Sequence, residues 1–236
     1  MTAQAQAPTR ANRSPGWVPF ALVALVVVPA VTGSARLVEV FGGPHVMPAN
    51  PRISASPLPV VVHIAGAIAY AVIGAFQFSP ALRRRWPKWH RVMGRVLVLL
   101  GLAVAVSALW MTLFYARQPG TGTLAYWLRL AFGSGMAASL VLGVVAIRGR
   151  DVAGHRAWMA RAYALALGAG TQVFTLGVGR AILGTTTLTT DLMLGAGWAI
   201  NLAVVEYALR RPRLLHRLRR LRRLRRPGAA VGAGVA

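Results

Sequence analysis

Residues 57–78 read PLPVVVHIAGAIAYAVIGAFQF, a run of apolar and small side chains without a single Asp, Glu, Lys or Arg. A helix needs about 20 predominantly apolar residues to cross a hydrocarbon core about 30 Å thick. Within that core every backbone N–H and C=O must find a partner inside the protein, and a helix provides those partners locally. A segment of this length and composition therefore predicts a membrane-spanning helix.

The composition of the whole chain agrees with that prediction. Of the 236 residues, 56% are hydrophobic and 13% are charged, about half the charged share of an ordinary soluble domain. The formal net charge is +23, and the cations lie beside apolar runs, so anionic lipid headgroups are simpler partners than nucleic acid. We expect no nucleic-acid binding. The absence of cysteine excludes disulfides, thiolate catalysis and Cys-ligated clusters.

Five further runs are similar in length and apolarity, and breaker-rich linkers separate them. The sequence therefore predicts an all-α, polytopic membrane protein with six transmembrane helices. They are expected at about Gly16–Val40, Pro57–Phe78, Val92–Tyr115, Leu124–Ile147, Ala157–Ile182 and Leu192–Leu209. Residues 16–209 would form one transmembrane domain, between an N-terminal tail at 1–15 and a basic C-terminal tail at 210–236. We expect the first helix to be retained, because its apolar run is longer than that of a cleaved signal peptide.

Lys and Arg are distributed unequally between the two sets of linkers. Most of the 27 cations fall in the two tails and in the linkers after the second and fourth predicted spans. The opposite side keeps Arg36, Arg52, Arg117, Arg129 and Arg180. Since cytoplasmic loops carry the excess of Lys and Arg, we expect a multi-pass protein of the inner or plasma membrane with both termini cytoplasmic.

The C-terminal tail has its own periodic pattern. In LLHRLRRLRRLRRPG (Leu214–Gly228), leucine recurs every third residue from Leu215 to Leu224, with arginines between. A helix of this pattern has a narrow apolar stripe and a broad cationic face, which suits the surface of an anionic leaflet. We expect it to bind anionic headgroups, and we expect the final AAVGAGVA to be disordered.

Two short motifs pair histidine with arginine at the basic end of the predicted bundle. They are RRRWPKWHRVMGR (Arg83–Arg95) and GHRAWMAR (Gly154–Arg161), and their histidines, His90 and His155, are 65 residues apart. The repetition suggests a duplicated helical hairpin, with the second and third spans related to the fourth and fifth. Together with HIAGAIAYAVIGAFQF, these motifs resemble an uncharacterised bacterial multi-pass membrane family, domain of unknown function 2306, over roughly Pro57–Arg180. The resemblance implies a helical membrane domain and no particular activity.

Ionisable and polar residues inside predicted spans are candidate sites, because each is costly unless it faces protein or water. In the second span, His63, Gly66, Tyr70, Gly74 and Gln77 follow helical spacing and share one face. We call this face the polar stripe; it either packs against neighbouring helices or lines a cavity. Related polar positions on other spans are Arg129, Gln172 and Arg180. We expect an outer cluster and an inner cluster, made respectively of Glu39, His63, Arg129, Arg180 and Asp191 and of Gln77, His90, His155, Arg161 and Glu206.

The paired histidines allow a redox alternative. Imidazole nitrogens bind haem iron, and a helix bundle can hold the ring. His90 and His155 would be the axial ligands, Gly94 and Gly101 would leave room on the face of His90, and Arg91, Arg95, Arg156 and Arg161 would pair with the propionates. The arrangement is similar to the six-helix b561-type cytochromes, but the second haem of that family has no matching histidine pair here. At most one haem b is therefore implied.

The sequence leaves three hypotheses for function. The first is a membrane protein that binds or carries a small molecule or lipid in the helix bundle. The second is a b-type haem or quinone-linked redox protein, and the third is a non-catalytic scaffold or accessory subunit. We assign no catalytic residue and no metal site, because no H-E-x-x-H motif, phosphate loop or nucleophile elbow occurs. Whether the protein is an enzyme is left open.

Overall fold

The computed structural model describes residues 16–224, with side chains through Arg211. The described part is helical and contains no strand. Its ten helices are α1 (Val18–Leu25), α2 (Val27–Val40), α3 (Pro51–Ala55), α4 (Pro57–Gln77), α5 (Pro80–Arg85), α6 (Pro87–Phe114), α7 (Thr123–Arg148), α8 (Val152–Ala166), α9 (Gly168–Leu183) and α10 (Thr187–Leu224). The predicted tail at 1–15, the end of the chain from 225 and the side chains of the predicted leucine stripe lie outside the described residues.

Four of these helices are long and apolar enough to span a membrane, namely α4, α6, α7 and α10 up to Arg211. Two pairs pass the same test only together: α1 with α2, bent by 46°, and α8 with α9, bent by 47°. The protein is thus an all-α polytopic membrane protein with four candidate spans, or six if each bent pair crosses the membrane once. The six predicted runs correspond to these four helices and two bent pairs.

The first and fifth predicted spans are each interrupted by a bend, which the residue runs did not predict. In the first, Pro29 has no N–H to donate to the carbonyl of Leu25, and the chain bends at Val26. In the fifth, the amide nitrogen of Asn201 donates a 3.0 Å hydrogen bond to the carbonyl of Ala164, the acceptor that Gly168 would use in a regular helix. The helix breaks at Leu167.

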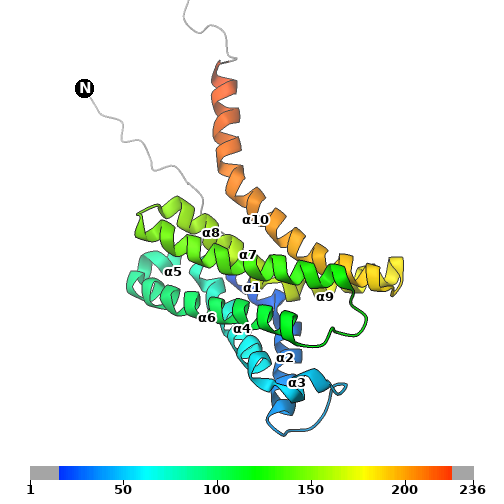
Figure 1. Cartoon of the computed structure of the whole chain (residues 1–236). Helices are drawn as coiled ribbons and strands as arrows, with labels where there is room; N and C mark the ends of the chain where they lie inside the picture. The colour runs from blue at the N-terminus through cyan, green and yellow to red at the C-terminus, as the bar shows by residue number, and fades with distance from the viewer. Residues whose placement is uncertain (1–15, 225–236) are drawn as a thin grey trace, which may run out of the picture.

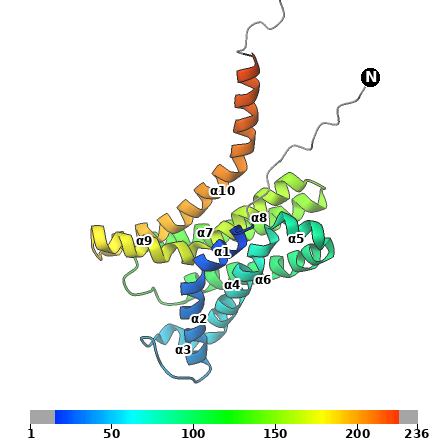
Figure 2. The ribbon, with the colours of Figure 1, turned by 180° about the vertical axis from the view of Figure 1, so that it is seen from behind.

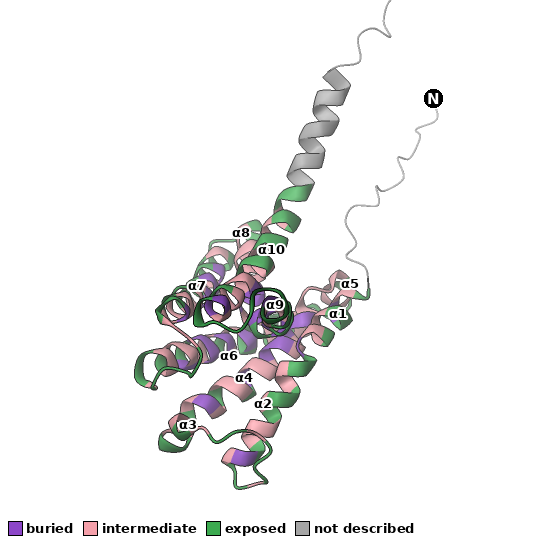
Figure 3. Cartoon of the chain, turned by 90° about the vertical axis from the view of Figure 1, so that its right-hand side faces the viewer, coloured by how far each residue is buried: buried purple, intermediate pink, exposed green. Residues whose placement is uncertain are grey.

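The two breaks pack against each other. Val26 and Leu167 are both buried in one core cluster, and a Cβ placed on Gly170 would collide with the carbonyl oxygen of Leu25. The rest of the core lies between α4, α6, α7 and α8, around Tyr70, Leu140 and Tyr163. Figure 3 shows the buried residues gathered inside the bundle and the exposed ones on its outside. Large apolar side chains such as Leu99, Trp127 and Phe174 are exposed, as expected of a lipid-facing surface.

The helices pair as two neighbouring hairpins, α4 with α6 and α7 with α8 (Figure 1). α5 and the turn between α7 and α8 lie at one end of the bundle, and the view from behind in Figure 2 agrees. This end carries the two His-Arg motifs, and we call it the basic end. The α6–α7 loop and the turn between α9 and α10 lie at the other end. The pairing is compatible with the predicted duplication, which stays a prediction.

Candidate functional site

The polar stripe of α4 faces α6 and α8. The ring nitrogen Nδ1 of His63 donates to the carbonyl of Val104 at 3.1 Å and lies 3.3 Å from Oγ of Ser107. A Cβ on Gly66 would come within 3.0 Å of Val104. This half of the stripe therefore makes a close helix–helix contact with α6, as small and hydrogen-bonding residues do in membranes.

The other half of the stripe holds an aromatic cluster. The rings of Tyr70 and Tyr163 are 5.9 Å apart, and Phe78 lies 4.9 Å from Tyr163. A Cβ on Gly74 would lie 2.7 Å from the ring of Tyr163. Small residues thus leave space that aromatic rings fill, and the geometry fits the packing interpretation of the stripe.

Gln77 is an exception within the stripe. Both polar atoms of its amide are buried, and neither has a hydrogen-bond partner among the described residues. The sequence placed Gln77 in the inner cluster, but no hydrogen bond joins it to His90, His155, Arg161 or Glu206. Another predicted member of the polar set, Gln172, donates a 2.9 Å bond to the carbonyl of Leu194 and ties α9 to α10.

At the basic end, part of the predicted inner cluster is brought together. Arg161 Nε lies 2.5 Å from a carboxylate oxygen of Glu206, and its guanidinium lies 4.7 Å from the ring centroid of Trp158. This pair joins α8 to α10. His90 lies within electrostatic range of His155 and of Arg83 and Arg91, so the two histidines share this end of the bundle.

The geometry bears on the haem alternative in two ways. Nδ1 of His155 lies 2.9 Å from the carbonyl of Gly143, so this nitrogen carries the proton and Nε2 is the atom left to bind a metal. Gly94 has open space around it, whereas a Cβ on Gly101 would lie 2.7 Å from the ring of Tyr70. The room expected at Gly101 is therefore filled by side chains.

The cations expected to pair with propionates differ in exposure. Arg91, Arg95 and Arg156 are exposed, and Arg161 is engaged by Glu206. The haem assignment stays a prediction, which an absorbance spectrum of protein expressed with added haem tests.

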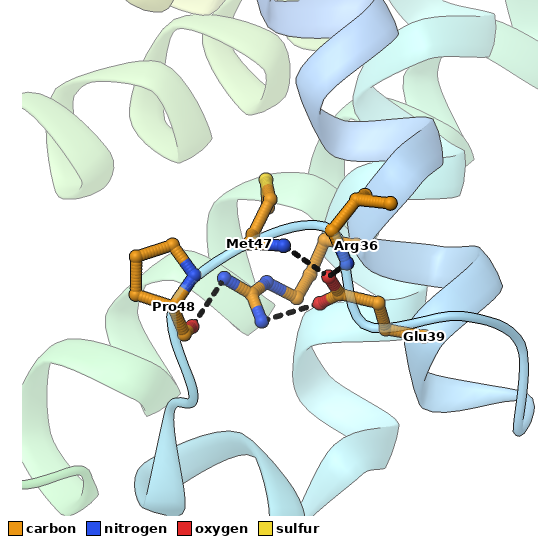
Figure 4. Close-up of polar contacts among 5 residues, drawn as sticks. Arg36, Glu39, Met47 and Pro48 are labelled. Carbon is orange, nitrogen blue, oxygen red and sulfur yellow. Dashed lines mark hydrogen bonds and ion pairs between the residues drawn. The ribbon is translucent and has the colours of Figure 1, made fainter.

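At the other end, Glu39 is enclosed by its own loop (Figure 4). One carboxylate oxygen accepts from the backbone N–H groups of Val46 and Met47 at 2.8 and 2.7 Å, and the other lies 2.5 Å from Arg36. Arg36 also donates to the carbonyl of Pro48 at 3.1 Å. Arg36 and Glu39, three residues apart on α2, form an ion pair that holds the loop after α2 against the helix end. Glu39 therefore has its own partners and makes no bond to the rest of the expected outer cluster.

Asp191, also expected in the outer cluster, caps a helix. It is buried at the start of α10, and its carboxylate accepts from the N–H of Gly122 at 2.9 Å and of Ala125 at 3.0 Å. A carboxylate at this position stabilises the first turn of α7. The bonds also fix the α6–α7 loop to α10.

Two predicted residues of the outer cluster, Arg129 and Arg180, line one cavity. It has a volume of about 340 Å³ and lies between the α6–α7 loop, α7, α9 and the start of α10. Its polar lining consists of Gln118, Thr121, Arg129, Arg180, Thr185 and Thr190. We call it the Arg129–Arg180 cavity. The nitrogen Nη2 of Arg129 donates to the side chain of Gln118 at 3.0 Å, which holds this guanidinium at the cavity wall.

No Asp or Glu side chain forms an ion pair with either arginine. The chain has four acidic residues, and all four lie within the part whose side chains are described. Asp151 caps α8 through the N–H of Gly154, and Glu39, Asp191 and Glu206 have the partners given above. Asp191 and Arg52 both act electrostatically on Arg129. The lining of the cavity is therefore rich in positive charge and hydroxyl groups.

The sequence identified the arginines of this cavity and missed its threonines. RQPGTGT and LGTTTLTTD were interpreted only as linkers, yet Thr121, Thr185 and Thr190 line the cavity. The available signal was the concentration of hydroxyl side chains in two linkers predicted on the same side as Arg129 and Arg180.

Comparison with known proteins identifies a family. The model of the family described as predicted membrane protein, DUF2306, matches residues 60–209. The chain belongs to the DUF2306 family. The match confirms the resemblance that the His-Arg motifs indicated and extends it through the membrane part of α10. The chain matches no curated protein and no solved structure. Membership of the DUF2306 family therefore supports a membrane protein and specifies no reaction.

Proposed function

We propose that this DUF2306 protein binds a small anionic ligand, with a phosphate or carboxylate group, in the Arg129–Arg180 cavity. The observation that carries the proposal is that two arginines from different helices line one cavity while no Asp or Glu side chain forms an ion pair with either of them. A bound anion would supply the missing counter-charge. Guanidinium groups suit this purpose because they present several N–H donors in a fixed plane.

The hydroxyl groups complement the arginines. Thr121 donates to the carbonyl of Gln118 at 2.8 Å, and Thr190 donates to that of Thr186 at 3.1 Å. Their oxygens retain lone pairs for donors on a ligand. The cavity volume of about 340 Å³ is at the lower end of the range of about 300–1,000 Å³ common for small-molecule sites. A ligand of the size of a sugar phosphate or a lipid headgroup would fit.

We further propose that the protein lies in the plasma membrane with both termini cytoplasmic. The unequal distribution of Lys and Arg supports this orientation. The Arg129–Arg180 cavity would then open on the extracytoplasmic side, and residues 16–209 would act as one domain. The tail at 210–236 would bind anionic headgroups at the cytoplasmic surface.

Ligand-dependent thermal stability of the purified protein in neutral nanodiscs tests the binding proposal. Inorganic phosphate, glycerol 3-phosphate and citrate serve as soluble anions, and nanodiscs containing phosphatidylglycerol provide the lipid source. We expect at least one of them to raise the melting temperature. The Arg129→Gln and Arg180→Gln variants should each weaken that ligand by about 10-fold or more, because each loses a charge-assisted contact.

The matched control is Arg117→Gln. Arg117 lies in the same loop region, but its guanidinium bonds to Thr123 at 3.1 Å and stacks on Tyr126 at 5.7 Å. This variant should retain affinity within about threefold. Equal weakening by all three variants would mean that only the overall charge of this end attracts anions. Stabilisation by none of the anions would instead support the scaffold hypothesis.

A further inference from the structure

A second cavity lies at the basic end, where the chain passes from α4 to α6. α4 ends at Gln77, the hydroxyl of Ser79 accepts from the N–H of Leu82 at 3.3 Å to begin α5, and α6 starts at Pro87. Between these elements is a groove of about 710 Å³, lined by Phe76, Leu82, Arg85, Trp86, Lys88 and Trp89. We call it the Trp86–Trp89 groove. It lies at the opposite end of the bundle from the Arg129–Arg180 cavity.

The groove combines an apolar interior with cations. Its accessible wall is almost entirely carbon, and Trp86 is 53% exposed. The guanidinium of Arg85 lies 5.6 Å from the ring centroid of Trp86. Lys88 follows in the first turn of α6. An apolar wall in contact with water is unfavourable in proportion to its area. The groove therefore favours an occupant that is apolar along its length and negatively charged at one end.

We propose that the Trp86–Trp89 groove binds one anionic phospholipid, with an acyl chain along Phe76, Leu82 and Trp86 and the phosphate between Arg85 and Lys88. Its position supports this occupant. α4 and α6 are both candidate spans, so the segment that joins them lies where a spanning helix leaves the hydrocarbon core. Tryptophan and basic residues are characteristic of that depth.

Other occupants fit less well. A soluble anion would use Arg85 and Lys88 but leave the aromatic wall exposed. An apolar helix of a partner would cover the wall but leave the cations unpaired. A second copy of this chain would bring further positive charge, since the formal net charge is +23. Charge complementarity thus favours an anionic lipid.

Tryptophan quenching by brominated lipids tests the proposal. The protein is reconstituted in nanodiscs of phosphatidylcholine with a small fraction of phosphatidylglycerol or phosphatidylcholine whose acyl chains carry bromine. We expect brominated phosphatidylglycerol to quench at a lower mole fraction than brominated phosphatidylcholine. The double variant Trp86→Phe/Trp89→Phe should lose the quenching component that saturates at low mole fraction, while the other five of the seven tryptophans remain.

Charge removal supplies the matched comparison. Arg85→Gln/Lys88→Gln should reduce the preference for phosphatidylglycerol by about 5- to 30-fold, since each cation near an anionic surface contributes to headgroup attraction. Arg148→Gln/Arg150→Gln removes the same charge from exposed positions at the same end and should change the preference by less than about twofold.

Two results would overturn the proposal. Equal loss in both charge variants would mean that the surface attracts headgroups without a defined groove. Competition by glycerophosphoglycerol, the same headgroup without acyl chains, at concentrations comparable to those of the lipid would show that no chain occupies the groove. All substituted positions except Trp89 are exposed, and the melting temperature of each variant verifies that it folds.

Discussion

The hydroxyl of Tyr163 in α8 donates a 2.6 Å hydrogen bond to the carbonyl oxygen of Ala71 in α4. This bond connects the two hairpins at the centre of the core, where both residues are buried. α4 continues without a break from Pro57 to Gln77, so the bond to Ala71 is made without interrupting this helix.

Substituting Tyr163→Phe removes this bond and keeps the ring. We expect a loss of about 0.5–1.5 kcal/mol in unfolding free energy, the range for a neutral hydrogen bond. Denaturant titration in mixed micelles measures it. Tyr207→Phe, on an exposed residue of α10, is the control and should change stability by less than about 0.5 kcal/mol. An equal effect of both variants would contradict the role of the Tyr163 bond.

Glycine positions differ in whether the space around them is filled. Gly74→Ala would place a methyl group 2.7 Å from the ring of Tyr163, and that ring is itself held by Phe78 at 4.9 Å. We expect destabilisation by about 1–3 kcal/mol, the usual cost of overpacking. The melting temperature in detergent provides the measurement.

Gly94→Ala is the matched control for this substitution. Gly94 also lies inside a spanning helix, but nothing lies within 4 Å of an added Cβ. Alanine should be neutral there or stabilise the helix by up to about 1 kcal/mol. If Gly94→Ala destabilised the protein as much as Gly74→Ala, the loss at Gly74 could not be attributed to contact with the ring of Tyr163.

The positions of the candidate membrane segments were predictable because they depend on sums over many residues. A run of about 20 apolar residues is recognisable whatever its neighbours are, and α4, α6, α7 and α10 follow such runs. The breaks in the other two spans depend on single contacts. In the first of these spans, Pro29 is a residue that disrupts helices, so the sequence did contain a signal for the bend. Nothing local to Leu167 indicated that Asn201, on α10, would take the carbonyl of Ala164.

The candidate site was predictable in part for a related reason. Spacing and charge indicated that Arg129 and Arg180 share the end opposite the His-Arg motifs. A pattern of side chains does not show which carboxylates accept hydrogen bonds from backbone N–H groups instead of pairing with arginines. Glu39 is such a case, since it accepts from the N–H groups of Val46 and Met47. Acids that looked like partners for Arg129 and Arg180 were therefore already engaged.

Two residues of the polar stripe should respond oppositely to substitution by leucine. Gln77→Leu removes buried polar atoms that have no partner in the described chain, so stability should stay the same or rise by up to about 2 kcal/mol. His63→Leu removes the contact with Val104 at 3.1 Å and should cost about 1 kcal/mol. Thermal unfolding in detergent compares them. A marked loss of stability in Gln77→Leu would indicate a bound water or ligand that pairs with its amide.

The number of times the chain crosses the membrane depends on the two bent pairs. If each pair crosses once, Val46 and Thr185 lie on one side, and Arg84 and Arg148 lie on the other. All four residues are exposed. The chain has no cysteine, so single substitutions Val46→Cys, Arg84→Cys, Arg148→Cys and Thr185→Cys can be labelled without background.

We expect an impermeant maleimide to label Val46→Cys and Thr185→Cys in intact cells and to label the two arginine positions only after permeabilisation. The unsubstituted protein controls for labelling at other residues. If α8 and α9 together formed a re-entrant loop, the chain between Arg148 and Thr185 would enter and leave the membrane on the same face. Thr185→Cys would then be labelled only after permeabilisation, as Arg148→Cys is. With that pattern, Thr185 and the α6–α7 loop would lie on opposite sides of the membrane, and they could not line one cavity. Proposed anion binding there would then fail together with the sixfold crossing.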